Sequence, residues 1–260
     1  MSIVDAIILG LVQGLTEFIP VSSSGHLILV EQFTSVESSF AFDVLLNIGT
    51  LAALVVYFWP KLIGIAKNLF SGRGSLVLNL FYSTLPVVII GGLFIGWFES
   101  DSLRSGWVVA TMLIAIGLVM VGLDRLNTLK KQTMDKLPVL SALSIGLGQV
   151  LALIPGTSRS GATIISGRLA GLSYKDAAEY SFLLAIPVIA GAIVRSLFEP
   201  ETARLWHSST GAVIIGILVA YFSGIIAIRF MLGWLSQKGL RQFGYYRIAL
   251  GLLVILTVVI

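Results

Sequence analysis

Two short polar segments of this chain, each set between apolar stretches, hold side chains that could do chemistry. The first reads QGLTEFIPVSSSGH, from Gln13 to His26. Glu17 lies four residues after Gln13, so these two side chains share one face of a helix. The apolar flanks place Glu17 at membrane depth, where a carboxylate costs about 2.5 kcal/mol or more and normally has a function and a partner. Glu17 is therefore a candidate general base or metal ligand. His26 is a candidate catalytic residue, with a simple hydrogen bond to a backbone carbonyl as its alternative.

Three serines follow Pro20 in the first segment. Proline ends the incoming helix, and serine is a favoured N-cap residue for the next one. The unpaired N–H groups at a helix start, together with the helix dipole, make an anion site. We therefore expect Ser22, Ser23 and Ser24 to form a site for an anionic substrate. A flexible polar linker is the alternative, but a linker would not have apolar helices on both sides.

The second segment reads PGTSRSGAT and places Arg159 between two serines at the same kind of break. A guanidinium beside hydroxyls and helix N–H groups suits phosphate oxygens, which arginine can hold with two hydrogen bonds. A snorkelling arginine is the alternative, but it needs a nearby interface, and Gly and Pro on both sides argue against one. Arg159 is a candidate catalytic residue. The candidate substrate-binding residues of this segment are Ser158, Ser160 and Thr163.

The elements that must position these residues are membrane helices. Of all residues, 57% are apolar and 12% are charged, whereas a soluble domain carries roughly 25% charged residues. The mean hydropathy is +0.98. Strand-like alternation is absent, which favours a helical bundle over a barrel. Six apolar stretches approach or exceed the ~17–25 residues of a spanning helix. They are 41–59, 76–98, 106–123, 182–198, 210–233 and 245–260.

The charged residues lie in short segments between these stretches, so the net charge of +4 indicates membrane orientation and not a nucleic-acid partner. The positive-inside rule places the basic segments in the cytoplasm and both termini outside it. The chain has no Cys, which excludes thiolate chemistry, and its start lacks the basic region of a signal peptide. The basic segments are 60–75, 125–138 and 234–247. The acidic or balanced segments are 31–43, 99–105 and 195–207.

This orientation requires segments 1–35 and 139–175 each to enter and leave the membrane on one side, as re-entrant hairpins do. The two hairpins are related: residues 6–29 align without gaps on 142–165, and nine of the 24 pairs are identical. Two such halves entering from opposite faces form an inverted-topology repeat, with the functional site where they meet. We predict an all-α polytopic membrane protein with six spanning helices and two re-entrant helical hairpins. The predicted single domain and its two halves are 1–260, about 1–135 and about 136–260.

The two polar segments resemble the signature motifs of the undecaprenyl-diphosphate phosphatase family, also called the bacitracin-resistance proteins. A YSFLLAIP pattern at 180–187 is similar too, and the likeness covers essentially the whole chain. The resemblance implies six spanning helices, two re-entrant hairpins, an active site reached from outside and a divalent cation, Mg²⁺ or Ca²⁺. Many members have Glu where this chain has Gln13, so the implied metal ligands, Gln13 and Glu17, include one carboxylate. The family's functional residues fall on Glu17, Ser22, Ser23, His26 and Arg159.

We therefore predict a membrane phosphatase that hydrolyses undecaprenyl diphosphate, or another polyprenyl diphosphate, to the monophosphate and phosphate and so recycles the lipid carrier. Its predicted partners are this lipid and the bilayer, with a possible homodimer. The nucleophile stays open among Ser23, His26 and a water activated by Glu17. The alternative function is a transporter that flips polyprenyl phosphate, because inverted repeats with broken helices are typical of transporters. An inert binding scaffold is a third reading, which the polar residues at membrane depth argue against.

Overall fold

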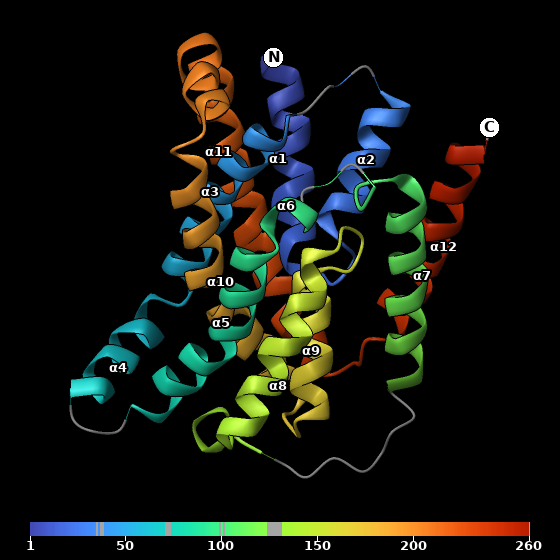
Figure 1. The fold of residues 1–260 in the computed structure, drawn as a ribbon. Helices are drawn as coiled ribbons and strands as arrows, with labels where there is room; N and C mark the ends of the chain where they lie inside the picture. The colour runs from blue at the N-terminus through green and yellow to red at the C-terminus, as the bar shows by residue number, and fades with distance from the viewer. Residues whose placement is uncertain are drawn as a thin grey trace.

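The computed structural model describes residues 1–34, 36, 39–70, 74–98, 100, 102–123 and 132–259. The elements in these ranges are helices, with one isolated bridge between Gln132 and Leu172 and no strand (Figure 1). The elements before residue 124 are α1 (Ile3–Phe18), α2 (Ser23–Phe33), α3 (Phe40–Tyr57), α4 (Trp59–Phe70), α5 (Ser75–Leu93), α6 (Ile95–Phe98) and α7 (Gly106–Leu123). The elements after residue 131 are η1 (Met134–Lys136), α8 (Val139–Val150), η2 (Leu151–Leu153), α9 (Arg159–Leu169), α10 (Tyr174–Ser196), α11 (Pro200–Leu235) and α12 (Arg241–Val259).

Five helices of the described ranges are long and apolar enough to cross a membrane: α3, α5, α7, α10 and α11. Large apolar side chains such as Leu118, Phe222 and Ile226 are exposed on them, as expected for surfaces that face lipid. An all-α, multi-pass membrane protein is thereby confirmed. α12 is not among the five.

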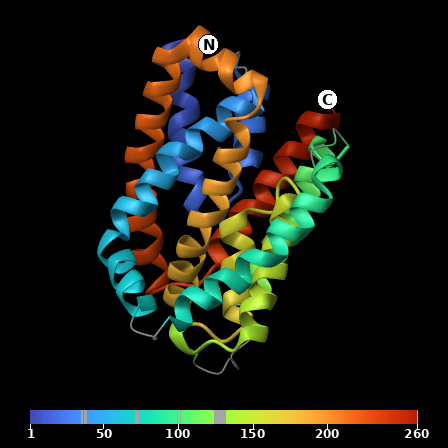
Figure 2. The same ribbon diagram turned by 60° about the vertical axis from the view of Figure 1, so that its left-hand side comes forward.

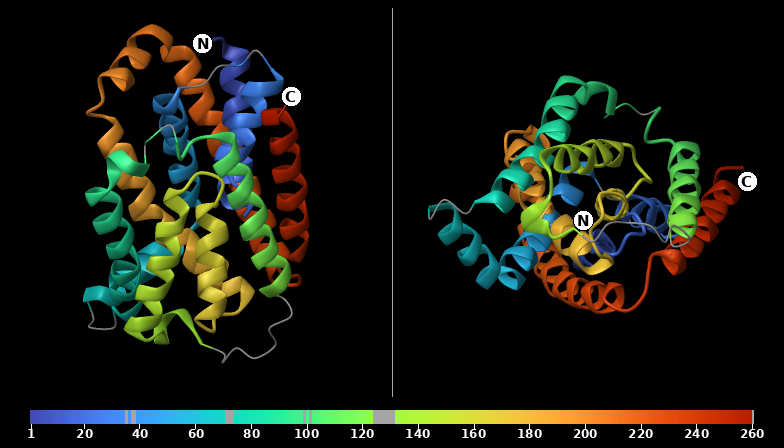
Figure 3. Two further views of the ribbon diagram at one scale, coloured as in Figure 1. Left: turned by 45° about the vertical axis from the view of Figure 1, so that its right-hand side comes forward. Right: turned by 90° about the horizontal axis from the view of Figure 1, so that it is seen from below.

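Each of the two polar segments joins a pair of antiparallel helices. α1 runs from the end of the molecule that holds both termini towards its middle, and α2 runs back (Figure 1). α8 and α9 form a similar hairpin that starts from the opposite end (Figures 1 and 3). Seen along the long axis, α9 lies near the centre, with other helices around it (Figure 3). The breaks fall where Pro20 and Pro155 predict them, between Phe18 and Ser23 and between Leu153 and Arg159.

Each hairpin packs against a long helix from the other part of the chain: α1 contacts α11, and α8 contacts α5. Gly10 makes the first contact close, since a Cβ there would lie 2.5 Å from Gly216 O. Gly146, which aligns with Gly10, makes the second contact close, since a Cβ there would lie 2.5 Å from Ser83 O. Small residues allow such close approach between membrane helices.

The core beneath the hairpin breaks is aromatic. Phe18, the last residue of α1, is fully buried and meets Phe182 of α10 edge to face, with ring centroids 5.5 Å apart. Tyr180 is also buried, and its hydroxyl lies 2.7 Å from Ser83 Oγ of α5. This packing fixes the end of α1, and with it the neighbouring Glu17, against α10.

Several of the segments expected as loops contain helix, and three of them differ most from that expectation. Segment 60–75 is largely α4, and segment 195–207 is largely the start of α11, which has a non-helical residue at Ser209 (φ −142°, ψ 33°). The turn between α10 and α11 lies at the same end as the N-terminus (Figure 2). In segment 234–247, α12 already begins at Arg241, and Arg247 is fully buried. The assignment of Arg247 to a cytoplasmic loop is therefore wrong, because backbone carbonyls rather than water solvate it.

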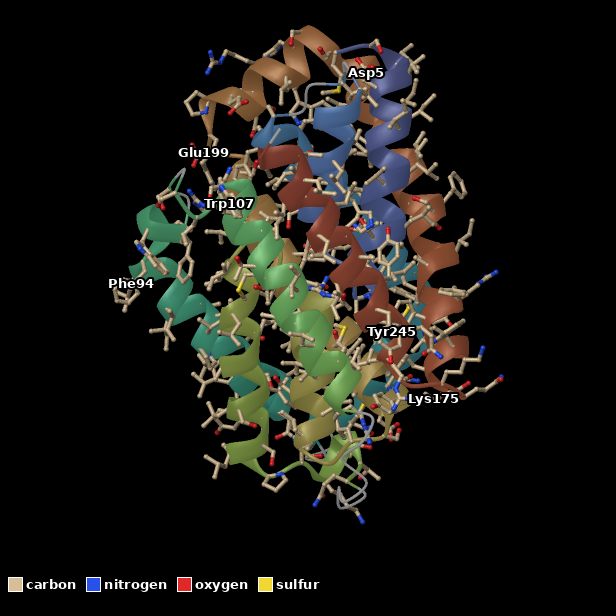
Figure 4. The ribbon with its side chains drawn as sticks, turned by 90° about the vertical axis from the view of Figure 1, so that its right-hand side faces the viewer. Asp5, Phe94, Trp107, Lys175, Glu199 and Tyr245 are labelled. Carbon is tan, nitrogen blue, oxygen red and sulfur yellow. The ribbon has the colours of Figure 1, made fainter. Side chains whose placement is uncertain are left out.

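Some of the charges used for orientation lie outside the described residues. Those that the structure describes include Asp5 and Glu199, which lie towards one end of the molecule, and Lys175, which lies towards the other (Figure 4). The basic residues outside the described ranges are Arg73, Arg125, Lys130 and Lys131. The acidic residues outside them are Glu37, Glu99, Asp101 and Asp124.

Candidate active site

The second helix of each hairpin starts from a serine with an unusual backbone conformation. Ser22, the N-cap of α2, has φ 74° and ψ 101°, and Ser158, the N-cap of α9, has φ 70° and ψ 116°. In the described part of the chain these are the non-glycine residues with positive φ. Such conformations cost about 1–3 kcal/mol each and cluster at functional sites. Both turns are therefore candidate functional sites.

The side chains of these two serines cap their helices in the same way. Ser22 Oγ accepts a hydrogen bond from Gly25 N at 3.4 Å, and Ser158 Oγ accepts one from Gly161 N at 3.1 Å. Each Oγ also lies close to the Oγ of the serine two residues later, at 3.1 Å in the first turn and 3.2 Å in the second. Each turn thus presents a helix N-terminus, where N–H groups and the helix dipole favour an anion.

The first residues of these two helices, Ser23 and Arg159, both contact Glu17 at the end of α1. Arg159 Nη2 donates to Glu17 Oε1 at 2.8 Å, and Ser23 Oγ donates to Glu17 Oε2 at 3.2 Å. The side chains of Glu17 and Arg159 are each 12% exposed, so the ion pair is largely shielded from water. The structure therefore brings together the acid, the serine and the guanidinium that the sequence singles out.

Gln13 lies one turn before Glu17 and holds it from the other side. Its Nε2 donates to Glu17 Oε2 and to Asn47 Oδ1, both at 2.9 Å. Asn47 comes from α3, and Thr50 Oγ1 donates to the same Oδ1 at 3.2 Å. Sequence reasoning missed Asn47, although an amide within an apolar stretch is an expensive residue that could have signalled it.

A cavity of about 110 Å³ opens beside the Glu17–Arg159 pair. It receives a cation, a carboxylate, three consecutive serine hydroxyls and two helix N-termini, which is a set of groups suited to phosphate oxygens. Its apolar wall comes from the break of the second hairpin. The lining residues are Thr16, Glu17, Ser22, Ser23, Ser24, Ala152, Ile154, Ser158 and Arg159.

Hydrogen bonds tie the two breaks to each other. Gly156 N, in the second break, donates to Ser24 Oγ of α2 at 3.2 Å. Ser160 Oγ of α9 donates to Ile19 O, in the first break, at 3.4 Å. Ser160 is fully buried and does not line the cavity. Its contacts are those of a residue that joins the hairpins.

Hydrogen bonds from α9 to Ser181 of α10 fix the position of α9. Arg159 Nη1 donates to Ser181 O at 3.3 Å, and the hydroxyls of Ser181 and Thr163 lie 2.6 Å apart. Thr163 Oγ1 also donates to Arg159 O at 2.8 Å. Thr163 is 1% exposed and lies outside the cavity lining, so its contacts orient α9.

His26 of α2 contacts the Ser22 turn on one side of its ring and α12 on the other. Its Nδ1 is 2.8 Å from Ser22 O, and its Nε2 is 2.7 Å from the hydroxyl of Tyr246 on α12. The two rings stack, with centroids 5.6 Å apart. The structure records no hydrogen bond between His26 and Glu17. Tyr246 was missed because it lies 220 residues from His26 in the sequence.

Comparison with known proteins gives a consistent picture. The family described as "Bacitracin resistance protein BacA" matches residues 6–253. The chain is 39% identical to the undecaprenyl-diphosphatase of Rubrobacter xylanophilus, covering 98% of this chain and 97% of the relative. It is 38% identical to that of Geotalea daltonii, covering 99% of each. It is 36% identical to undecaprenyl-diphosphatase 1 of Mesorhizobium japonicum, covering 100% of this chain and 98% of the relative.

Proposed function

This chain belongs to the bacitracin resistance protein family, and from that premise we propose that it hydrolyses undecaprenyl diphosphate to undecaprenyl phosphate and inorganic phosphate. Relatives that match it along their full length carry the name undecaprenyl-diphosphatase. The observation that carries the proposal is the Arg159–Glu17 pair of 2.8 Å beside two capped helix N-termini. This arrangement supplies both the cation that a diphosphate needs and a group that can accept a proton.

Substrate binding would exchange the partner of Arg159. In the structure its guanidinium pairs with Glu17. A diphosphate is the stronger competitor, because it carries more charge and offers oxygens for a bidentate contact. Once Arg159 and the helix N-termini bind the terminal phosphate, Glu17 is free to accept a proton. The same groups then stabilise the charge on the transferred phosphoryl group.

The geometry favours Ser23 as the nucleophile. Its Oγ already donates to Glu17 Oε2 at 3.2 Å, within the range expected for a nucleophile and its base. Ser23 Oγ would attack the terminal phosphorus while Glu17 takes the hydroxyl proton, and the bond from phosphorus to the bridging oxygen would break, so that undecaprenyl phosphate leaves. A water then attacks the phosphoserine, the bond between phosphorus and Ser23 Oγ breaks, and Glu17 returns its proton to Ser23 Oγ. Inorganic phosphate leaves with the oxygen and the protons of the attacking water.

A divalent cation fits the donor set. In the described residues no group of three or more His, Asp or Glu side chains could hold a metal. Gln13 nevertheless contacts both Glu17 and Asn47, and each of these three side chains carries an oxygen that could bind a cation. Proteins typically bind Mg²⁺ through one or two carboxylates together with substrate phosphates. A half-turn of the Gln13 amide would present its oxygen in place of its nitrogen. Mg²⁺ or Ca²⁺ at these residues would neutralise phosphate charge in the transition state.

The proposed membrane arrangement has α12 as the sixth spanning helix and α1–α2 and α8–α9 as re-entrant hairpins. The two hairpins support it by pointing in opposite directions, and the equivalent contacts of Gly10 and Gly146 support an inverted repeat with halves of about 1–135 and 136–260. Both termini would then lie outside the cytoplasm. A reporter active only in the cytoplasm and fused to the C-terminus should stay silent, and strong activity would contradict the arrangement.

The deciding experiment is phosphate release by the purified protein from C55 diphosphate, with and without chelator. We expect release that stops with excess chelator. Full activity in chelator would remove the metal from the mechanism.

The transporter alternative predicts movement of labelled polyprenyl phosphate across a vesicle membrane without phosphate release. A homodimer stays a prediction.

A further inference from the structure

One buried cation takes no part in the chemistry described above. Arg247 of α12 is 0% exposed and is the largest fully buried side chain of the described residues. It donates hydrogen bonds to four backbone carbonyls rather than to a side chain. The acceptors are Pro20 O at 3.2 Å, Met112 O at 3.3 Å, Gly156 O at 2.7 Å and Thr157 O at 3.0 Å.

Three of these carbonyls belong to the two strained turns, and the fourth, Met112 O, belongs to α7. Pro20 lies two residues before the N-cap Ser22, and Gly156 lies two residues before the N-cap Ser158. Pro20 and Gly156 are aligned in the gapless repeat, so Arg247 binds the same carbonyl of each hairpin. One side chain thus joins the two turns at equivalent points.

The charge of Arg247 has no carboxylate partner. Among the described residues no Asp or Glu lies within ion-pair distance of it, whereas Arg159 has Glu17. A buried guanidinium without a counter-charge is costly, so its presence calls for a reason beyond packing. At the hairpin junction it leaves two arginines against one carboxylate, which favours an anionic occupant of the neighbouring cavity.

We propose that Arg247 is a positioning residue for the phosphatase reaction. Through the carbonyls of the two breaks it fixes the turns that carry Ser23 and Arg159, and its charge makes the junction receptive to diphosphate. This inference rests on the proposed function. It differs from a packing role, which would affect stability alone.

The test compares Arg247→Gln, Arg247→Lys and the control Arg241→Gln, an exposed arginine at the start of the same helix. Phosphate release gives kcat and KM, and thermal unfolding with and without inorganic pyrophosphate reports anion binding independently of turnover. A displacement of about 1 Å at a reacting group can cost about 10²-fold. We therefore expect Arg247→Gln to lose about 10²-fold, mainly in kcat, and to lose most of the stabilisation by pyrophosphate. The control should match the wild type.

Arg247→Lys separates the two parts of the proposal. It keeps the charge, but one ammonium cannot span carbonyls from both hairpins as the planar fork does. We expect it to recover pyrophosphate stabilisation while kcat stays at least about tenfold low. A folded Arg247→Gln protein that unfolds at a lower temperature yet keeps wild-type kcat would overturn the inference. If Arg247→Gln does not fold, wild-type kcat in Arg247→Lys would overturn it. A wild type and an Arg241→Gln protein that release no phosphate would instead refute the proposed function.

Discussion

The two hairpins share a backbone frame and differ in the side chains that it carries. Ser22 and Ser158 have nearly the same φ and ψ and the same capping bond. The next residue is Ser23 in one hairpin and Arg159 in the other, and both side chains contact Glu17. Each hairpin thus offers a helix N-terminus to an anion, while the serine comes from one and the cation from the other.

At two other aligned positions, the first hairpin has a titratable side chain and the second has an apolar one. The first hairpin carries Glu17 and His26, and the aligned positions of the second are Leu153 and Ala162. An acid would be superfluous in the second hairpin, because one base suffices and a further carboxylate would repel phosphate. A duplicated anion-binding turn can therefore become an active site when one copy keeps a proton acceptor and the other gains a permanent cation. Each of the following variants replaces one side chain of one hairpin and so tests what that hairpin contributes.

Removing the serine of the first hairpin should have the largest effect. If Ser23 is the nucleophile, Ser23→Ala should lose about 10⁴-fold or more in kcat, because only direct attack by water remains. Ser24→Ala, which keeps the neighbouring backbone, serves as the control and should lose far less. Mass spectrometry of rapidly quenched wild type should detect phosphoserine at residue 23. A Ser23→Ala enzyme that keeps a tenth of its turnover would assign the nucleophile to His26 or to a water held by Glu17.

Removing the cation of the second hairpin should come next. Arg159→Ala loses a charge-assisted contact in a site poor in water, so we expect kcat/KM to fall about 10²–10⁴-fold. Arg159→Lys keeps the charge without the fork and should recover little. The measurement is phosphate release by protein whose size-exclusion profile shows that it is folded.

The matched control is Arg168→Ala in the last turn of the same helix. Arg168 Nη1 donates to Leu172 O at 2.5 Å, and its guanidinium lies 4.1 Å from the Tyr174 ring centroid. These contacts are away from the cavity, so the loss should stay under about tenfold. Near-normal turnover in a folded Arg159→Ala protein would place the phosphate site elsewhere.

Much of this arrangement could be predicted from the sequence because it depends on local sequence patterns. Helix breaks at Pro20 and Pro155 and serine caps after them are short-range signals, and the repeat indicated that the breaks meet. Tyr246 and Arg247 could not be found in this way, and the apolar surroundings of Asn47 could have marked it as unusual without showing what it contacts. Each reaches the site from a helix remote in the sequence, and only three-dimensional packing brings it there.

Arg247 shows most clearly why the remainder was inaccessible. Near the end of a basic segment, an arginine is indistinguishable by sequence from a cytoplasmic loop charge. Four carbonyls from three separate segments make its burial tolerable, and none of them is visible as a pattern. The orientation argument itself is little affected, because Lys238 and Arg241 remain in that segment.

Restoring a carboxylate to the first hairpin should have a small effect. Gln13→Glu places a second acid beside Glu17, where oxygen ligands for a cation are few. We expect kcat/KM to stay within about threefold and the affinity for Mg²⁺ to rise, because added ligand charge tightens binding of hard cations. A Mg²⁺ titration of phosphate release measures both. A complete loss of activity with unchanged Mg²⁺ dependence would show that Gln13 serves as a hydrogen-bond donor to Glu17 and not as a metal ligand.

The smallest effect is expected at the glutamine that the second hairpin retains. Gln149 aligns with Gln13 and is 1% exposed, but neither of its amide atoms has a hydrogen-bond partner in the described residues. The acid that Gln13 holds has no counterpart there, because the aligned residue is Leu153. Burying an unsatisfied amide costs about 1–3 kcal/mol, so Gln149→Leu, which has similar volume, should leave turnover within about twofold and raise or preserve thermal stability. Gln13→Leu is the matched variant, and it should lose about tenfold or more in kcat/KM because Glu17 loses a positioning bond. Thermal unfolding and phosphate release, measured for both variants, show whether the two glutamines have the same role. If Gln149→Leu loses as much turnover as Gln13→Leu, the second glutamine holds a water or a substrate oxygen, and the chemistry is shared more evenly between the hairpins than their contacts indicate.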